Sequence, residues 1–205
     1  MESYWNHNTA FHDELVADVK ARGGRVLDIG CGDGLLVHRL APFAEKVVGI
    51  DPHKEIISRA QERLASLSNV TLIADDLLKI PMKEQYDTIT YVATLHHMDI
   101  RAALSKMHQI LAPGGRVLII GLAANKSIMD YLLSGFLLLP IRIMDRFHGG
   151  MKSIGVRTAE PKESLGQIRQ VAHEILPGAI IRHRFYHRYS LGWTKLKDEH
   201  ENSIK

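Results

Sequence analysis

The chain has 205 residues, of which 45% are hydrophobic and 24% charged, and its formal net charge is +3. This size suits one domain with an appended cap, and so small a positive charge does not by itself indicate nucleic-acid binding. The single cysteine excludes an internal disulfide and a cysteine-rich metal site. The polar N-terminal sequence MESYWNHNTAFHDEL lacks the apolar stretch of a secretion signal, so we predict a cytoplasmic protein.

Helical and strand patterns alternate along the first 121 residues. In chain order, we expect a helix over 8–21, a strand over 25–30, a helix to about 41, a strand over 46–51, a helix over 53–66, a short strand near 70–74, a strand over 86–93, a helix over 99–111 and a strand over 116–121. Such alternation predicts an α/β fold, a Rossmann-like doubly wound sheet that is mostly parallel and has helices on both faces.

The pattern changes beyond residue 121. A helical stretch over 125–147 exceeds the minimal fold, and an amphipathic helix over 164–176 and strands over 179–186 and 188–194 follow it. We therefore expect a single domain, 1–205, whose parts are an N-terminal cover (1–24), a cofactor-binding core (25–121), a cap or substrate region (122–178) and a C-terminal hairpin (179–196).

An apolar segment over 128–143 lies in this cap. It is shorter than the roughly 20 residues that a membrane-spanning helix needs. A buried or cap helix is the favoured interpretation, so we predict no transmembrane span. Contact with a membrane surface or with a lipid-like substrate stays open.

The sequence VLDIGCGDG at 26–34 has the pattern of a buried strand that ends in a glycine-rich loop. Glycines at alternate positions adopt backbone angles that other residues avoid, and they let the backbone approach a ligand. The next segment, LLVHRL at 35–40, is typical of a helix, whose first N–H groups have no partner within the helix. This strand–loop–helix arrangement predicts a site for a nucleotide-like cofactor.

The spacing of these glycines disfavours a dinucleotide. In the G-x-G-x-x-G pattern that binds a pyrophosphate, the third glycine counted from Gly30 would stand at position 35, which is Leu35. Asp33 inside the loop would repel a pyrophosphate. We expect it to tolerate or favour a cofactor that carries an amine and a sulfonium cation.

A second acidic residue, Asp51, ends the next expected strand. Folds of the α/β nucleotide-binding kind place a carboxylate there to accept hydrogen bonds from ribose hydroxyls. Pro52 and His53 follow directly, so no Arg or Lys adjoins Asp51 to receive a 2′-phosphate. The pattern therefore predicts a nucleoside with a free ribose.

Five segments in this order resemble the class I S-adenosylmethionine-dependent methyltransferases. They are VLDIGCGDG at 26–34, VVGIDP at 47–52, ADDLLKIP at 74–81, YDTITYVATLHHM at 86–98 and LAPGGRVLII at 111–120. The resemblance implies an enzyme of the EC 2.1.1 class that uses S-adenosyl-L-methionine and releases S-adenosyl-L-homocysteine. It also implies a C-terminal hairpin with an antiparallel last strand. The motifs identify the class of cofactor with high specificity, but they give little information about the methyl acceptor.

The same resemblance assigns residues to the cofactor. Asp28 would help to hold the amino group, although a carboxylate that caps the loop amides is the alternative. Asp51 would bind the ribose and Asp75 the adenine amino group; Asp76 is the rival of Asp75, and a helix N-cap is the alternative for either. The loop and neighbouring strand ends would complete the site with Gly30, Cys31, Gly32, Gly34, Pro52, Leu77 and Ala93.

The acceptor is expected beside Thr94, His96 and His97, at the sheet edge where ligands bind in open α/β folds. His96 and His97 are candidate general bases, because histidine titrates at about pH 6.5. The alternative is that one packs and the other only faces the cofactor. His7 and His12 are further candidates for contact with the substrate. The alternative is that they only pack on the sheet.

We expect a small-molecule acceptor, and the apolar segment 128–143 favours an apolar one. The chain lacks the Asn/Asp-Pro-Pro-aromatic box and the Pro-Cys pair of enzymes that methylate bases, which excludes DNA and disfavours RNA. In the basic run 182–189, alternation predicts a solvated charged face, with Phe185 and Tyr189 pointing inward. No spacing of the histidines indicates a metal site. The alternatives left open are an NAD(P)-dependent oxidoreductase, a non-catalytic S-adenosylmethionine-binding protein and an RNA methyltransferase.

Overall fold

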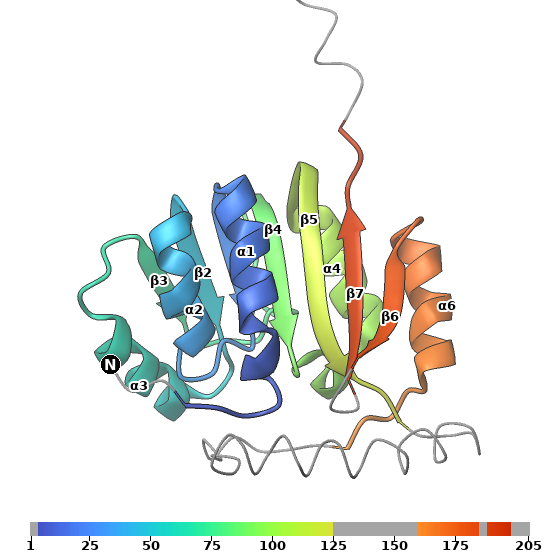
Figure 1. Cartoon of the computed structure of the whole chain (residues 1–205), viewed down its shortest axis with the longest axis horizontal. Helices are drawn as coiled ribbons and strands as arrows, with labels where there is room; N and C mark the ends of the chain where they lie inside the picture. Colours follow the sequence, from blue (N-terminus) through green and yellow to red (C-terminus); the bar gives the residue numbers. More distant parts are fainter. Residues whose placement is uncertain (1–3, 125–159, 185–187, 198–205) are drawn as a thin grey trace, which may run out of the picture.

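The structure is a computed structural model that describes residues 4–124, 160–184 and 188–197, and the statements below concern these residues. They form a seven-stranded sheet. Its strands are β1 (Arg25–Ile29), β2 (Lys46–Ile50), β3 (Val70–Ile73), β4 (Tyr86–Val92), β5 (Leu111–Leu122), β6 (Ile180–Arg184) and β7 (Arg188–Thr194). The order across the sheet is β3-β2-β1-β4-β5-β7-β6 (Figure 1).

The strands from β3 to β5 are parallel to their neighbours, whereas β7 is antiparallel to both β5 and β6. This confirms the predicted sheet with an antiparallel last strand. Helices α1 (His12–Arg22), α2 (Leu35–Leu40) and α3 (Lys54–Leu64) cover one face, and α4 (Ile100–Ile110) and α6 (Leu165–Ile175) cover the other (Figure 1). Three short 3-10 helices join these elements: η1 (Thr9–Phe11), η2 (Ala41–Phe43) and η3 (Leu95–His97).

An apolar core lies under each helical layer. In β1, Val26 packs into the core beneath α1, α2 and α3, and the next residue, Leu27, packs into the core beneath α4 and α6. Val47 and Val48 of β2 divide in the same way. Because both faces of the sheet are covered, the central strands are apolar at consecutive positions rather than at alternate ones.

Local side chains set several helix boundaries. Gly23, at φ +66°, follows the last residue of α1 and ends the helix. Asp99 begins α4 by accepting a hydrogen bond from the N–H of Ala102 at 2.7 Å. Ser164 and Gln167 form a capping box at the start of α6, in which each side chain accepts from the other residue's backbone N–H.

Strand β5 begins earlier than predicted. Pro113-Gly114-Gly115, a typical turn signal, lies between the expected helix over 99–111 and the expected strand over 116–121. However, β5 starts at Leu111, directly after α4. Leu111 pairs with Tyr86 of β4, and Arg116 pairs with Thr88, so the residues between Leu111 and Arg116 lie out of register with β4. The predicted turn residues therefore form an irregularity within a strand rather than a connection before it.

Most of the predicted cap falls outside the described residues, including the helix expected over 125–147 and the apolar segment 128–143. At the edge of this gap, the Ala124 N–H bonds to the Glu163 carbonyl oxygen at 2.8 Å, and Ala124 forms a β-bridge with Ser164. The chain thus leaves the end of β5 and returns beside it at the start of α6. None of the helices in the described part of the chain is long and apolar enough to cross a membrane.

Candidate cofactor and acceptor site

The glycine-rich loop follows β1 at the carboxyl edge of the sheet. Gly30, Gly32 and Gly34 have φ values of +71°, +55° and +78°, which side chains disfavour. A Cβ at Gly30 would lie 2.1 Å from the Thr94 Oγ1, and one at Gly34 would lie 2.7 Å from a methyl carbon of Leu64 in α3. The first glycine therefore lets the loop approach the end of β4, and the third lets the loop pack against α3.

Backbone hydrogen bonds fasten the loop to the end of β2. The N–H groups of Gly30 and Cys31 donate to the Ile50 carbonyl oxygen at 2.7 and 3.1 Å. The Gly32 N–H donates to Oδ2 of Asp51 at 3.2 Å. These amides are therefore bonded within the protein, so a ligand would meet the loop through its carbonyl oxygens and glycine Cα atoms.

Asp51 lies where the sequence predicted, directly after β2, and is 5% exposed. Its Oδ1 accepts from the backbone N–H of His53 at 3.0 Å and lies 3.0 Å from the Nδ1 of the same residue. The carboxylate thus holds the glycine loop with one oxygen and the start of α3 with the other. His53 was not among the predicted site residues; the available signal was its place two residues after the acid, at the N-cap of α3.

Asp28 is buried in β1, with 2% exposure. The Thr90 Oγ1 in β4 donates to its Oδ1 at 2.7 Å. Burial raises the pKa of Asp28, the Thr90 hydrogen bond lowers it and the nearby charge of Asp51 raises it, and together they bring it to about 7. Asp28 therefore sits near the midpoint of its titration at neutral pH. Sequence reasoning missed Thr90, whose hydroxyl has no local motif to mark it.

The side chain of Asp33 is engaged within the protein. Tyr4 donates its hydroxyl proton to Oδ1 at 3.0 Å, and Arg63 of α3 donates to Oδ2 at 2.8 Å. Because Arg63 meets the charge of Asp33, the argument that this residue favours a cationic cofactor loses its basis. The glycine spacing, with Leu35 where the third glycine would stand, and the later motifs still disfavour a dinucleotide.

Cys31 is buried, and this burial raises the pKa of its thiol above the usual range. The Sγ atom lies 3.8 Å from the Gly32 carbonyl oxygen. A thiol in this state is protonated and is a poor nucleophile. Only the backbone atoms of Cys31 are therefore suited to contact a ligand.

Two neighbouring acids follow β3. The Oδ1 of Asp76 accepts from the Leu78 N–H at 3.0 Å, and its Oδ2 lies 3.7 Å from the Lys79 ammonium. The Oδ1 of Asp75 accepts from the N–H of Asp76 at 2.7 Å. Asp76 thus caps a turn. No helix lies between β3 and β4, a stretch that the structure describes throughout, so neither acid is the helix N-cap that was the alternative for it. Leu77 is 1% exposed, and its side chain belongs to the core.

The end of β4 carries an unusual backbone angle. Ala93 has φ +54°, and among the described residues it is the one non-glycine residue with positive φ. Its N–H donates to the Ile120 carbonyl oxygen of β5 at 2.7 Å, and the Thr94 Oγ1 donates to the Val92 carbonyl oxygen at 3.0 Å. Such angles cost roughly 1–3 kcal/mol and gather at functional sites. The strain lies beside Gly30, where the sequence predicted the acceptor.

His96 and His97 lie in η3 with ring centroids 4.1 Å apart. The Nδ1 of His96 is buried and has no hydrogen-bond partner among the described residues. Burial, together with the charges of His97 and Arg188, lowers the pKa of His96 to about 4. Burial and the charge of His53 also lower the pKa of His97, which is more exposed. Both rings are therefore neutral near pH 7, as a proton acceptor must be, although a lowered pKa makes a weaker base.

The N-terminal segment bridges this site. Tyr4 bonds to the glycine loop, as described above, and Asn8 accepts hydrogen bonds from Arg188 at the start of β7, at 3.2 and 2.9 Å. The rings of Trp5 and His7 stack edge to face with centroids 5.7 Å apart. The residues just before α1 therefore connect the glycine loop to the start of β7.

His12 lies apart from these residues. It is 5% exposed on α1, and its Nδ1 has no hydrogen-bond partner among the described residues. Burial and the charge of Arg39 in α2 lower the pKa of His12 to about 4. The structure therefore places His12 in the α1–α2 packing and does not bring it together with His96.

The basic run near the C-terminus differs from its prediction at two positions. Arg182 is exposed and Tyr189 is buried, as predicted. Arg184, however, pairs with Glu14, and Arg188 is partly buried against Asn8. Both arginines reach back to the N-terminal part of the chain, a contact that alternation along one strand cannot reveal.

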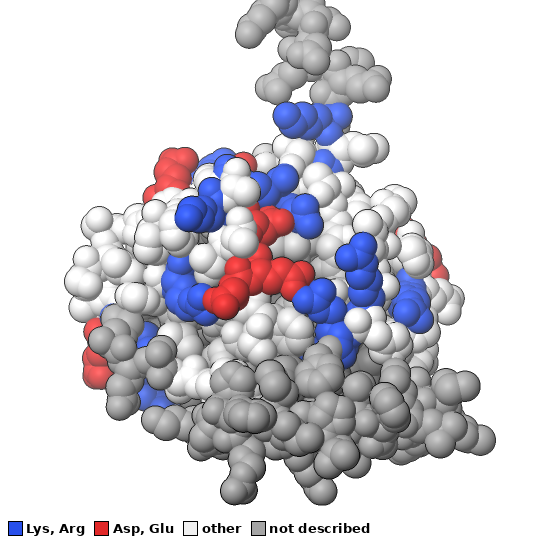
Figure 2. Space-filling model, viewed as in Figure 1, with Lys and Arg blue, Asp and Glu red and all other residues white. Residues whose placement is uncertain are grey.

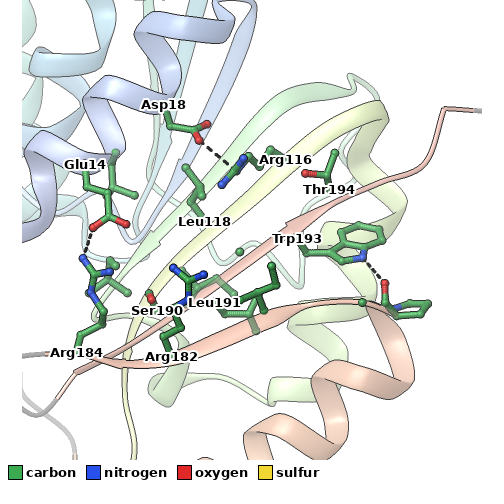
Figure 3. A pocket seen from close by; sticks show the side chains of 17 residues that line it. Glu14, Asp18, Arg116, Leu118, Arg182, Arg184, Ser190, Leu191, Trp193 and Thr194 are labelled. Atoms are coloured by element: carbon green, nitrogen blue, oxygen red, sulfur yellow. Dashed lines mark hydrogen bonds and ion pairs between the residues drawn. The ribbon is translucent and has the colours of Figure 1, made fainter.

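A separate hollow lies on the α1 face of the sheet, over β5, β7 and β6 (Figure 3). It has a volume of about 500 Å³, and Glu14 and Asp18 of α1 face Arg116, Arg182 and Arg184 across it. Asp18 lies 3.2 Å from Arg116. Over this part of the molecule, acidic side chains are bordered by basic ones (Figure 2). The residues assigned to the cofactor do not line this hollow, so it is distinct from the predicted site.

A metal site would need a group of suitable ligands. Within residues 4–124, 160–184 and 188–197, no three His, Cys, Asp or Glu side chains are grouped so that they could hold a metal ion. The histidines named above bond or stack with other residues, or are buried singly. The described site therefore consists of carboxylates, glycines and imidazoles.

Comparison with known proteins places the chain in a family. A family model described as a methyltransferase domain matches residues 26–115. An uncharacterized methyltransferase of Mycobacterium tuberculosis is 30% identical to this chain over 194 residues, which is 94% of this chain and 98% of that protein.

Similar folds occur among solved structures. The N-methyltransferase NodS from Bradyrhizobium japonicum, in complex with S-adenosyl-L-homocysteine, matches with a TM-score of 0.63 and 18% identity over 93% of this chain and 88% of that one. The magnesium protoporphyrin IX methyltransferase from Synechocystis PCC 6803, with S-adenosylmethionine bound, matches with a TM-score of 0.61 and 20% identity over 95% and 86% of the two chains.

The fold and the site define a methyltransferase of the Rossmann-like kind, with a glycine loop after β1 and an acid after β2. This chain belongs to the class I S-adenosylmethionine-dependent methyltransferases.

Proposed function

We propose that this enzyme transfers the methyl group of S-adenosylmethionine to a small-molecule acceptor by in-line displacement. The observation that carries the proposal is the junction at Asp51, whose buried carboxylate bonds to Gly32 and to His53 at the carboxyl edge of the sheet. Open α/β sheets bind the ribose of a nucleoside at such a junction. The positive φ angles of Gly30 and Gly32 leave the same place without side chains, which fits a close approach of the adenosyl group.

The methionine end of the cofactor fits the loop after β1. The Gly30 and Cys31 amides bond to Ile50 of β2 and the Gly32 amide bonds to Asp51, so the cofactor's amino group would meet loop carbonyl oxygens, as a donor requires. Asp28 lies in β1 directly before this loop, and its ionised form would favour a positive amino group nearby. In this arrangement Cys31 contributes only backbone.

The adenine end fits the loops after β2 and β3. We assign Asp75 to the adenine amino group in preference to Asp76, because the Asp76 carboxylate already caps Leu78 and faces Lys79. Leu77 would contribute its backbone, since its side chain lies in the core. Pro52, which follows the ribose-binding acid, would lie along the edge of the same pocket.

The acceptor would lie at the end of β4, beside Ala93 and Thr94. The bound cofactor supplies an already activated methyl group, so the chain has mainly to position the acceptor, an effect that can contribute roughly 7–11 kcal/mol. For a hydroxyl acceptor, the neutral rings of His96 or His97 would accept its proton. An amine acceptor would need no such base.

Other parts of the proposal derive from the sequence alone. The apolar segment 128–143 favours an apolar or lipid-like acceptor, although this segment lies outside the described residues. His7 stays a candidate for the substrate side through the N-terminal segment. The proposed compartment is the cytoplasm, and the proposed partner is a small molecule rather than DNA or RNA.

Calorimetry against three ligands tests the cofactor, and transfer of a labelled methyl group tests the reaction. We expect S-adenosylmethionine and S-adenosylhomocysteine to bind and NAD not to bind, followed by transfer to some members of a small-molecule acceptor panel. Binding of NAD with no binding of the adenosyl ligands would contradict the proposal. Tight binding without transfer would favour a non-catalytic role, and salt-sensitive affinity for RNA would favour an RNA acceptor.

A further inference from the structure

Strand pairing defines the floor of the hollow over β5, β7 and β6. Leu118 of β5 pairs with Gly192 of β7, and Gly192 pairs with Ile180 of β6. Leu118 packs on the α1 face of the sheet, and residues paired across strands share a face, so this row lies in the hollow. Ile180 is 59% exposed. The row is therefore apolar and partly open.

Gly192 leaves the centre of this row without a side chain. Beyond its chain neighbours, a Cβ at this position would meet no atom closer than the Arg116 Nη2, at 3.9 Å. A glycine inside a strand weakens the strand, and it often marks a place where a ligand or another backbone approaches closely. Because no other backbone of the described residues approaches Gly192 on this face, a ligand is the remaining explanation.

The adjacent row adds two polar side chains to the hollow. Ile120, Ser190 and Arg182 are paired across the same three strands and also line it. Within the described residues, neither the Ser190 hydroxyl nor the Arg182 guanidinium has a hydrogen-bond or ion-pair partner. Directly opposite residues have Cβ atoms about 4.5–5.5 Å apart, so these two side chains can donate to the same group. Figure 3 shows Arg182 extending from β6 toward the middle of the hollow.

The charges that line the hollow do not balance. Asp18 lies 3.2 Å from Arg116, and Glu14 pairs with Arg184, so each carboxylate of α1 faces an arginine (Figure 3). Arg182 is the third arginine of the lining, and no third carboxylate among the described residues lines the hollow. The hollow therefore has an excess of one positive charge, which lies beside the apolar row.

We propose that this hollow is a second binding site, for a small amphipathic anion. The oxyanion group of the ligand, a carboxylate or a phosphate, binds Arg182 and the Ser190 hydroxyl, since a planar guanidinium matches two oxygens of such a group. The apolar body of the ligand lies over Gly192 and covers Ile180, which removes apolar surface from water. The volume of about 500 Å³ lies within the roughly 300–1,000 Å³ of small-molecule sites.

Arg182 alone has a simpler explanation, because a charge on an edge strand deters pairing with another sheet. That role requires neither the hollow nor a glycine at position 192. The experiment therefore has to separate an exposed charge from a site that also recognises an apolar body.

Short-chain anions make this separation. Full-length protein without cofactor is titrated with hexanoate, hexyl phosphate, acetate and hexanamide, and backbone amide chemical shifts are followed by NMR. We expect saturable, millimolar binding of at least one six-carbon anion, with shifts centred on Ser190 and Gly192. Acetate, which lacks the apolar body, should bind at least about tenfold more weakly, and hexanamide, which lacks the charge, should not bind. The tighter of the two six-carbon anions identifies the ligand group as carboxylate or phosphate.

Two variants and a matched control make the result specific. Arg182→Gln should weaken binding of the six-carbon anions by about tenfold or more. Gly192→Val fills the apolar row and should weaken it to a similar extent, and the open space at this position allows the variant to fold. Arg169→Gln removes an exposed arginine of α6, outside the hollow, and should leave anion binding unchanged.

Several outcomes would overturn the inference. It fails if neither six-carbon anion binds at millimolar concentration, if hexanamide binds as well as hexanoate, or if acetate does. It also fails if Gly192→Val, with an unaltered melting temperature, binds these anions as the wild type does. Shifts of the same amides that grow with protein concentration in the absence of ligand would instead assign the hollow to a second copy of the chain. None of these measurements involves the cofactor, so they decide this site independently of the proposed function.

Discussion

Asp51 connects the two segments that would form the ribose end of the proposed site. Its two oxygens bond to Gly32 in the loop after β1 and to His53 at the start of α3. A carboxylate held in this way is oriented before any ligand arrives, which limits the entropy that binding would cost. The importance of Asp51 should therefore appear in cofactor affinity rather than in folding.

Replacement of Asp51 by alanine should weaken the affinity for S-adenosylhomocysteine by about tenfold or more. The reason is twofold, because the variant loses the acceptor for the ribose hydroxyls and also releases the Gly32 amide. Calorimetry measures the affinity, and circular dichroism checks that the variant is folded. Asp13→Ala, which removes an exposed carboxylate paired with Arg39, is the control and should bind normally. An unchanged affinity in the Asp51 variant would refute the ribose assignment.

Asp28 should make cofactor affinity depend on pH. Its pKa is raised to about 7 in the free protein, and a nearby positive amino group would favour the ionised form. Binding would then release a proton below this pKa, so affinity for S-adenosylmethionine should rise as the pH rises through about 7 and level off above it. Calorimetry across this range measures the effect.

The matched variant for this prediction is Asp28→Asn, which keeps the oxygen that accepts from Thr90. Its affinity should vary less with pH than that of the wild type. The unfolded chain ionises Asp28 from about pH 4 and the folded protein only near pH 7, so stability falls between these values and the loss is complete above about pH 7. The variant buries no charge, so it should melt higher than the wild type above that pH. Identical pH profiles for the two proteins would show that Asp28 does not act on the cofactor.

Residue-scale prediction from the sequence succeeded where a local pattern marks a residue. Asp51 and the loop glycines lie where the sequence placed them, because a strand end and a glycine loop are defined by neighbours along the chain. Arg188 was expected to be solvated, and its contact with Asn8 joins residues far apart in sequence. No local pattern encodes such a contact, and the same holds for the hydrogen bond from Thr90 to Asp28.

At the scale of elements, the glycine loop and α2 act as one unit between β1 and α3. Gly34 begins α2 at φ +78°, and Ala60 and Leu64 of α3 fill the space that a side chain at Gly34 would occupy. Gly32 lies in the loop between Gly30 and Gly34, and its φ angle is +55°. The shape of the loop therefore depends on backbone angles that few residues other than glycine adopt.

Replacement of Gly32 by valine should abolish binding of S-adenosylhomocysteine. A β-branched residue is strained at positive φ, and its side chain would stand where the cofactor approaches. Calorimetry measures the loss, with Gly166→Ala on α6 as the control. A Cβ at Gly166 meets no atom closer than 3.8 Å, so this control should bind normally and gain a little helix stability. Normal binding by the Gly32 variant would contradict the model of the loop.

The elements themselves were predictable except where tertiary pairing overrode a local signal. β1, β2 and β4 begin where the expected strands began, because apolar runs bounded by glycine or polar residues are strong signals. The predicted start of β5 was wrong. Pro113-Gly114-Gly115 is a turn signal, but these residues lie within β5 as an irregularity in its pairing with β4. Sequence patterns indicate the local conformational preference of a segment, whereas pairing with a neighbouring strand determines where the strand begins and ends.

At the scale of the whole molecule, contacts between distant segments surround the carboxyl edge of the sheet. The N-terminal segment reaches the glycine loop through Tyr4 and reaches β7 through Asn8, and α1 reaches β6 through Glu14 and Arg184. Cofactor and acceptor would thus bind among elements from both ends of the chain. A ligand at that edge should stabilise the fold as a whole, since it would connect several elements at once.

Saturating S-adenosylhomocysteine should raise the melting temperature of the full-length protein. Ligand at 100 times its dissociation constant adds about 2.7 kcal/mol of stability, and each kcal/mol is worth roughly 2–4 °C at this size. A rise of about 5–10 °C is therefore expected by scanning calorimetry. NAD at the same concentration should give no rise, and neither should S-adenosylhomocysteine with the Asp51→Ala variant. A rise with NAD would contradict the nucleoside assignment.

A crystal structure of the protein soaked with S-adenosylhomocysteine tests the central claim most directly. The account predicts density for the ligand at the carboxyl edge of the sheet, with the ribose hydroxyls in hydrogen-bond contact with Asp51 and the methionine portion along Gly30 and Gly32. Ligand bound elsewhere, for example in the charged hollow over β5, β7 and β6, would contradict it, and so would a crystal that takes up no ligand.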